Sequence, residues 1–243
     1  MQLAIDIGNT YIKAGLFSED KLLGTIRFVA GEEMDFLNFI AGKKINYTIF
    51  SSVESSEAEA VIGLLKDTKI IQLDHNTPLP LINNYLSPET LGKDRLAGAI
   101  GAWVMSGGKS VLVIDAGTCI KYDFVDESQG YMGGSISPGL QMRLDAMHHF
   151  TARLPSLTLK RTTDFYGNDT FSAMMTGVVT GAVGECSHFI QVFKKRFGKF
   201  NVILTGGNAD FLSLQLENKY SVEPNLILTG LNSILNFNKN NDK

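Results

Sequence analysis

The sequence predicts an α/β protein of two similar domains that face each other across a cleft. Strands alternate with helices along most of the 243 residues, which is typical of parallel β-α-β units. A strand that ends in Asp-x-Gly and turns into the next strand occurs twice, at residues 6–10 (DIGNT) and 115–118 (DAGT). The length fits two domains of about 120 residues each. We expect these domains to comprise residues 1–107 and 108–243.

The first domain is expected to begin with an antiparallel meander and to continue with β-α-β units. Apolar and β-branched runs bounded by turn residues predict strands, and apolar residues at helical spacing predict helices. The expected strands are 2–7, 11–17, 21–29, 47–50 and 69–73. The expected helices are 32–40, 56–65 and 93–105, with a proline-containing loop over 75–91.

The second domain is expected to repeat this order. Its predicted strands are 110–114, 121–125, 130–136 and 201–204, and its predicted helices are 139–150, 168–197, one from 208, and 225–236. A row of small residues marks one face of the long helix: Ala173, Gly177, Gly181 and Gly184. We expect this face to pack closely against a neighbouring element, and a dimer contact is the second interpretation.

Composition excludes several classes of protein. The chain is 44% hydrophobic and 19% charged, which is ordinary for a globular protein and unlike a disordered one. Its net charge is −3 without a basic block, so we expect no nucleic-acid partner. It has no signal-like start and no apolar run of membrane-spanning length, so we expect a cytoplasmic protein without a membrane partner. Its two cysteines form neither a zinc motif nor a disulfide framework.

The first Asp-x-Gly turn has the residues of a phosphate-binding turn. The backbone N–H groups of Gly8, Asn9 and Thr10 could hold phosphate oxygens. Asp6 could bind Mg²⁺ directly or through water, and Lys13 could neutralise charge. The alternative is a plain β-turn, since Asn and Gly both favour turns.

The second turn strengthens the phosphate-binding interpretation, because one nucleotide phosphate chain could lie between two such turns. A later segment, Thr205-Gly206-Gly207, follows a predicted strand and opens a helix. There the glycines could let the chain pass close to adenine or ribose. A simple helix start with flexible glycines is the alternative.

The segment at residues 92–95 (GKDR) opens a predicted helix. Asp94 could be only an acid favoured by the helix dipole, and Arg95 only a solvated charge. However, phosphoryl transfer to an alcohol needs a carboxylate that orients the hydroxyl and accepts its proton. A neighbouring arginine can bind a substrate carboxylate with two parallel hydrogen bonds.

Two further positions have a structural and a functional interpretation. Tyr85, in the proline-containing loop, could cap the core or contact a ligand. Thr170 begins the long helix, where Asn168 or Asp169 already suffices as a cap.

Together, the motifs resemble the sugar kinase, Hsp70 and actin superfamily of ATP-binding folds. Within it, nearly the whole chain is similar to the type III pantothenate kinases. The resemblance is carried by residues 6–15 (DIGNTYIKAG), 91–95 (LGKDR), 115–118 (DAGT), 133–140 (GGSISPGL), 151–155 (TARLP), 167–170 (GNDT) with Gly177 and Gly181, and 205–209 (TGGNA). The chain departs from the family after Thr118, where Cys119-Ile120-Lys121 replace small residues and threonines.

The resemblance implies two actin-like (ribonuclease H-like) ATPase domains with mixed sheets flanked by helices, and ATP in the cleft between them. The implied reaction transfers the γ-phosphoryl group of ATP to the terminal hydroxyl of pantothenate. The product, 4′-phosphopantothenate, begins coenzyme A synthesis. Mg²⁺ and a monovalent cation, K⁺ or NH₄⁺, are the implied cofactors, and a homodimer is the implied assembly.

The resemblance also implies roles for individual residues. Asp94 would be the general base, and Asp115 would hold the monovalent cation. ATP would be bound by Asp6, Ile7, Gly8, Asn9, Thr10, Tyr11, Ile12, Lys13 and Thr118. Pantothenate would be bound by Tyr85, Gly92, Lys93, Asp94, Arg95 and Thr170.

Two other functions stay open from the sequence. One is a kinase of the same superfamily that acts on a sugar or an acetate-like acceptor, against which residues 92–95 and Tyr85 argue. The other is a non-enzymatic ATP-binding accessory factor in transcription. The presence of Asp94 together with both turns favours an enzyme.

Overall fold

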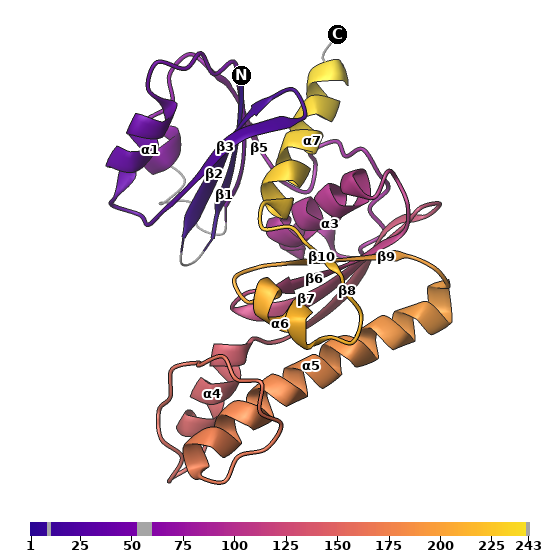
Figure 1. Cartoon of the computed structure of the whole chain (residues 1–243). Coiled ribbons are helices and arrows are strands. Elements are labelled where there is room, and N and C mark those ends of the chain that lie inside the picture. The colour runs from indigo at the N-terminus through magenta and orange to yellow at the C-terminus, as the bar shows by residue number, and fades with distance from the viewer. Residues whose placement is uncertain (9–10, 53–59, 242–243) are drawn as a thin grey trace. The chain divides into compact units, whose positions relative to one another are not determined.

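Two five-stranded sheets with the same strand order form the framework of the chain (Figure 1). The computed structural model describes residues 1–8, 11–52 and 60–241. The first sheet has the order β3-β2-β1-β4-β5, with β1 Gln2–Ile7, β2 Ile12–Ser18, β3 Lys21–Phe28, β4 Tyr47–Ser52 and β5 Lys69–Gln72. The second has the order β8-β7-β6-β9-β10, with β6 Val111–Ala116, β7 Cys119–Asp126, β8 Gly130–Pro138, β9 Asn201–Thr205 and β10 Ser221–Val222. The predicted α/β class with two similar mixed sheets is therefore confirmed.

The register of the first sheet determines which residues meet at its edge. β1 pairs with β2 antiparallel and with β4 parallel. In these ladders Asp6 lies opposite Lys13 of β2 and opposite Ser51 of β4. Because β1 and β4 are parallel, their carboxyl ends reach the same edge of the sheet.

Contacts within the chain divide it into two compact units. The first unit comprises Met1–Gly108, Val125–Met132 and Asn225–Lys243, and the second comprises Lys109–Phe124 and Gly133–Pro224. The helices of the first unit are α1 Glu33–Ile40, α3 Lys93–Met105 and α7 Leu226–Asn241, with a short 3₁₀ helix, η1, at Pro88–Thr90. α7 lies beside α3 and packs on β1, β2 and β4 (Figure 1). The domain boundary expected after residue 107 stays a prediction.

The C-terminal helix α7 is longer than the sequence predicts, since it continues past Asn236. Its last turns are held by hydrogen bonds to other segments of the first unit. The amide of Asn236 donates to Asp20 at 2.8 Å, and the amide of Asn238 donates to the carbonyl of Pro78 at 2.9 Å. These partners lie far away in the sequence, so the local pattern does not reveal them.

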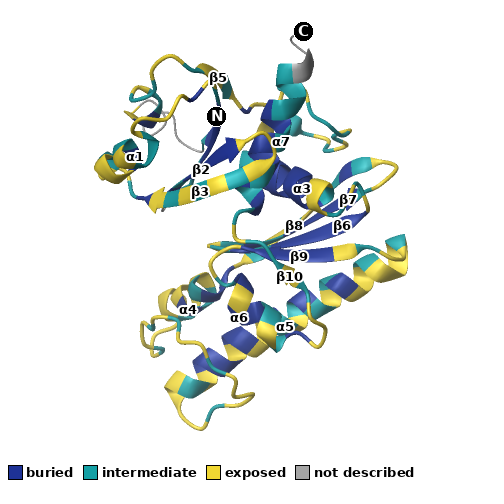
Figure 2. Cartoon of the chain, turned by 45° about the horizontal axis from the view of Figure 1, so that its top comes forward, coloured by how far each residue is buried: buried dark blue, intermediate teal, exposed yellow. Residues whose placement is uncertain are grey.

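The helices of the second unit are α4 Leu140–His149, α5 Thr170–Phe197 and α6 Ala209–Gln215. Buried and exposed residues alternate along α5, as expected for a helix with one face on the core (Figure 2). Asp169 caps this helix in a capping box, in which Ser172 N–H donates to the Asp169 carboxylate at 2.8 Å. Thr170 is therefore not needed as the cap.

The row of small residues on α5 differs from the expectation. No described atom lies within 4 Å of a Cβ placed at Gly177 or at Gly184. Close packing against a neighbouring element of the described chain is therefore wrong for these two positions. The dimer contact remains as the second interpretation.

Most other differences concern short elements. Residues 56–59 of the predicted helix at 56–65 lie outside the described residues, and of the remainder residues 60–62 are helical. The sequence does not predict η1 or β10, which are too short to show a periodic pattern. None of the described helices is long and apolar enough to cross a bilayer.

The contact between α3 and α7 gives a prediction about stability. A Cβ at Gly101 would overlap the carbonyl oxygen of Leu226 and lie 3.0 Å from the backbone nitrogen of Gly230. We expect Gly101→Ala to lower the free energy of unfolding by about 1–3 kcal/mol, because neither backbone can yield easily. The measurement is urea unfolding followed by circular dichroism.

Gly98→Ala is the matched control on the same helix. Its Cβ would lie 3.8 Å from Cγ1 of Ile227, an ordinary contact. Alanine there should be neutral or should stabilise by up to about 1 kcal/mol through helix propensity. Equal effects of the two substitutions would contradict the close approach of α3 and α7.

Candidate active site

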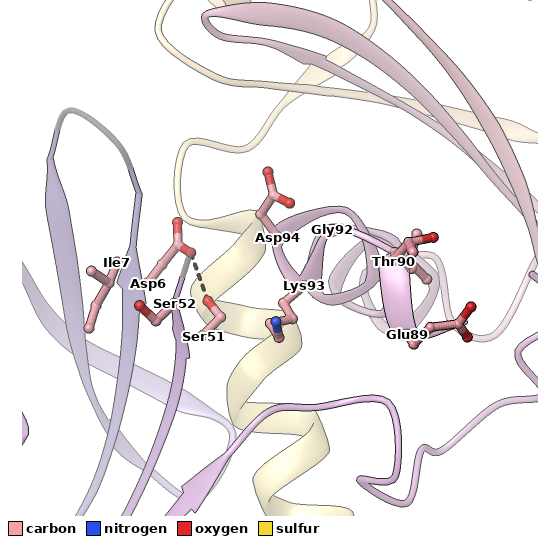
Figure 3. Close-up of a pocket in the computed structure, with 10 residues that line it drawn as sticks. Asp6, Ile7, Ser51, Ser52, Glu89, Thr90, Gly92, Lys93 and Asp94 are labelled. Atoms are coloured by element: carbon pink, nitrogen blue, oxygen red, sulfur yellow. Dashed lines mark hydrogen bonds between the residues drawn. The ribbon is translucent and has the colours of Figure 1, made fainter. Parts of the chain in front are cut away.

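A cavity of about 180 Å³ opens in the first unit where β1 and β4 end and α3 begins (Figure 3). Strand ends supply one side of this cavity, and η1 with the first turn of α3 supplies the other. Its lining residues are Asp6, Ile7, Ser51, Ser52, Glu89, Thr90, Leu91, Gly92, Lys93 and Asp94. The cavity thus contains the start of the first Asp-x-Gly turn and the expected general base.

Asp6 is held in place by the neighbouring parallel strand. The hydroxyl of Ser51 donates to Oδ1 of Asp6 at 2.8 Å, and Ser51 is only 2% exposed. A buried hydroxyl of this kind fixes the rotamer of the carboxylate that it contacts. Ser51 is a site residue that the sequence motifs did not indicate. Its signal is the pair of serines at the end of β4, which pairs with a strand that has an aspartate one residue before its end.

Lys13 places a positive charge opposite Asp6. Burial lowers the pKa of the Lys13 ammonium below its ordinary value, the carboxylate of Asp6 raises it, and the positive charge of Arg27 lowers it further. Burial is the largest of these three effects. An anion bound at the turn would favour the charged form of Lys13.

The first turn itself is closed by a backbone hydrogen bond from Gly8 N–H to the carbonyl of Tyr11 at 3.2 Å. The guanidinium of Arg27 lies 4.4 Å from the centre of the Tyr11 ring. Asn9 and Thr10, which the sequence assigns to phosphate binding, lie outside the described residues.

Asp94 lies in the first turn of α3 and lines the cavity together with Asp6. In Figure 3 the carboxylates of Asp6 and Asp94 project to the same side, whereas Lys93 projects to the opposite side. No side chain among the described residues caps α3 at Gly92. A Cβ at Gly92 would lie 2.7 Å from Oδ1 of Asp94, so glycine leaves room for this carboxylate.

Arg95 is buried, with only 7% of its surface exposed, so the interpretation as a solvated charge is wrong. Its Nη1 donates to the hydroxyl of Tyr85 at 3.5 Å, and the guanidinium lies 5.5 Å from the centre of that ring. Tyr85 in turn stacks on Tyr131, with 6.2 Å between ring centres. Tyr85 therefore contacts Arg95, the residue that follows Asp94 in the sequence. Neither Tyr85 nor Arg95 lines the cavity. Thr170 is exposed and belongs to the second unit.

The second turn lies in the second unit, at the end of β6. Gly117 N–H donates to the carbonyl of Cys119 at 3.0 Å, and Gly139 N–H donates to the carbonyl of Thr118 at 3.1 Å. Oδ2 of Asp115 accepts a hydrogen bond from the ammonium of Lys121 at 2.8 Å. At Oδ2 of Asp115, where the resemblance implies a free monovalent cation, the structure thus has the ammonium group of Lys121.

A magnesium ion fits the first turn better. Mg²⁺ in kinases is commonly held by one or two carboxylates together with substrate phosphates and water. Asp6 supplies such a carboxylate at the edge of the cavity. No three His, Cys, Asp or Glu side chains within residues 1–8, 11–52 and 60–241 come together as a metal site.

Comparison with known sequences gives a consistent result. The sequence pattern of the family described as type III pantothenate kinase matches residues 2–192. A type III pantothenate kinase of Christiangramia forsetii is 40% identical over 241 residues, which cover 98% of this chain and 99% of the relative. One from Bacteroides fragilis is 39% identical and covers 98% of each chain.

Comparison with solved structures supports the fold. A Campylobacter jejuni protein assigned to the Baf family of transcriptional activators has a TM-score of 0.62 at 23% identity, over 98% of this chain and 99% of that one. A ROK family glucokinase of Streptomyces griseus has a TM-score of 0.51 at 12% identity, over 97% and 98%. At these identities the structures show a shared sugar-kinase-like, actin-like ATPase fold.

The position of Lys13 opposite Asp6 gives a prediction about its titration. In Asp6→Asn the pKa of the Lys13 ammonium should fall further, because the carboxylate that raises it is lost. The measurement is a pH titration of lysine side-chain NMR signals, with Lys13 assigned through Lys13→Gln. Asp35→Asn, which removes an exposed acid on α1, should leave this pKa unchanged. A Lys13 pKa that rises in Asp6→Asn would contradict the described pairing.

Proposed function

The chain belongs to the type III pantothenate kinase family, and from this premise we propose that it transfers the γ-phosphoryl group of ATP to the terminal hydroxyl of pantothenate. The product is 4′-phosphopantothenate, and the reaction begins coenzyme A synthesis. The observation that carries the proposal is the cavity lined by both Asp6 and Asp94. The proposed phosphate-binding turn begins at this cavity, and Asp94 would receive the proton of an alcohol bound there.

Asp94 is proposed as the general base. Its carboxylate would accept a hydrogen bond from the pantothenate hydroxyl, aim the oxygen at the γ-phosphorus and take the proton as the new bond forms. Phosphoryl transfer has a loose transition state, so the residues act mainly by positioning and by charge stabilisation. A side chain at position 92 would crowd Oδ1 of Asp94, so the glycine leaves room for the carboxylate that lines the cavity.

The nucleotide is proposed to bind through residues 6–13 and Thr118. The backbone N–H groups of the first turn would bind phosphate oxygens, and Lys13 would offset their charge. A bound anion would also raise the pKa of the Lys13 ammonium, which burial lowers. Mg²⁺, when bound beside Asp6, supplies neutralisation of the phosphate charge.

The acceptor is proposed to bind beside Asp94. Gly92 and Lys93 line the same cavity as Asp94. Contacts of Arg95 and Tyr85 with pantothenate are part of the proposal through the family resemblance, since these two residues pair with each other and do not line the cavity. A contact of Thr170 with pantothenate is part of the proposal through the family resemblance alone.

A homodimer in the cytoplasm completes the proposal. The open space at Gly177 and Gly184 on α5 within the described chain supports a contact with a second copy. No step of the proposed reaction uses a free monovalent cation, because Asp115 already binds Lys121.

The general-base role predicts a large kinetic effect for Asp94→Asn. Loss of a general base typically lowers kcat by about 10²–10⁴-fold, and we expect a loss in this range with ATP binding intact. The measurements are pantothenate-dependent ADP release and calorimetric titration with ATP. Near-wild-type turnover would remove Asp94 from this role.

Asp35→Asn is the matched control for this experiment. Asp35 is an exposed acid in the first turn of α1, just as Asp94 lies in the first turn of α3. If Asp94 served only the helix dipole, the two substitutions would have similar small effects. The same assay also separates the two other candidate functions. ADP release with an acceptor other than pantothenate would indicate a different small-molecule kinase. ATP binding without ADP release for any acceptor would indicate a non-enzymatic regulator.

A further inference from the structure

The second turn carries a positive charge supplied by the chain itself. We propose that the ammonium group of Lys121 replaces the monovalent cation that the family resemblance implies at Asp115, so that the enzyme needs no free K⁺ or NH₄⁺. This inference rests on the proposed function, because the positive charge of Lys121 would offset the negative charge of the nucleotide that Thr118 is proposed to contact.

The contact between the two side chains is direct. Nζ of Lys121 lies 2.8 Å from Oδ2 of Asp115, which satisfies both a hydrogen bond and an ion pair. The side chains are 18% and 15% exposed. A pair that is largely withdrawn from solvent is screened by salt much less than a surface pair. Ordinary concentrations of K⁺ should therefore not disrupt it.

The backbone places Lys121 across from Asp115. Gly117 N–H donates to the carbonyl of Cys119 and closes the turn. Asp115 lies two residues before this hydrogen-bonded pair, and Lys121 lies two residues after it. They lie on β6 and β7, which are neighbours in the sheet. The pairing is therefore set by the turn and does not depend on a flexible loop.

The first turn has the same arrangement. Gly8 N–H donates to the carbonyl of Tyr11, and the residues two positions outside it are Asp6 and Lys13, which are opposite each other in the ladder. Each half of the molecule thus places a lysine opposite the aspartate of its Asp-x-Gly turn.

The surroundings of Asp115 leave little room for a free ion. Asp115 lies opposite Thr205 in the ladder between β6 and β9. Directly after Thr205, a Cβ at Gly206 would overlap Oδ1 of Asp115, so the backbone passes closely over this oxygen. The other oxygen binds Lys121. A free cation would need one of these oxygens as a ligand, and it would be repelled by the ammonium already present.

The chemistry of the replacement is simple. A lysine ammonium group carries one compact positive charge and three N–H donors. A free ammonium ion carries the same charge and has four N–H donors. A tethered group does not have to be recruited from solution, so its local concentration is high at every turnover. Lys121 would thereby offset nucleotide charge with no dependence on the salt composition.

The test compares wild type with Lys121→Thr in choline, Na⁺, K⁺ and NH₄⁺ chloride at constant ionic strength. Two quantities are measured: the rate of pantothenate-dependent ADP release, and the Tm of the substrate-free protein. Wild type should show the same rate and Tm in all four salts. Lys121→Thr should lose about tenfold or more of its rate in choline, as expected when one partner of a shielded charge pair is removed. K⁺ or NH₄⁺ should restore much of that rate and raise the Tm of the variant.

Activation of wild type by K⁺ or NH₄⁺ would overturn the inference while leaving the proposed function intact. A Lys121→Thr variant that neither cation rescues in rate or in Tm would overturn it as well. Lys121→Gln serves as a second variant, and the wild-type salt series stands even if both variants fail to fold. Lys199→Ala, which removes an exposed lysine before β9, controls for loss of charge and should behave as wild type. If no pantothenate-dependent ADP release occurs, the proposed function fails, and the Tm series alone decides the role of Lys121.

Discussion

Parallel pairing of β1 with β4 is the constraint on which the proposed site depends. It brings the ends of the two strands to one edge of the sheet, where Ser51 holds the carboxylate of Asp6 at 2.8 Å. α3 begins at the same cavity and presents Asp94 there. A shift of this register by one residue would turn Asp6 to the other face of the sheet. The first turn and Asp94 would then no longer share a cavity.

The two halves of the molecule use the same framework for different electrostatic arrangements. In the first half, Asp6 accepts a hydrogen bond from Ser51, and burial lowers the pKa of Lys13. A bound anion would raise this pKa. In the second half, Asp115 binds Lys121 directly, and the backbone at Gly206 covers its other oxygen. The duplicated hairpin therefore supplies one carboxylate that lines a cavity and one that forms an ion pair with Lys121.

Much of the framework could be predicted from the sequence, because strand and helix periodicity and the repeated Asp-x-Gly turn are local signals. The same is true of Asp94 at the start of α3 and of Asp169 as the cap of α5. Ser51 was missed because its contact with Asp6 arises from pairing between strands that are distant in the sequence. The length of α7 was underestimated for the same reason, since Asp20 and Pro78 hold its last turns. Lys121 was noticed as a departure, but only the structure shows its ion pair.

The most direct test of the central claim is a crystal structure with pantothenate and a non-hydrolysable ATP analogue. The account predicts that the γ-phosphoryl group lies at the first turn and that the pantothenate hydroxyl lies about 2.6–3.2 Å from the Asp94 carboxylate, the range for a general base. A hydroxyl bound elsewhere, with the Asp94 carboxylate directed to solvent, would contradict the account.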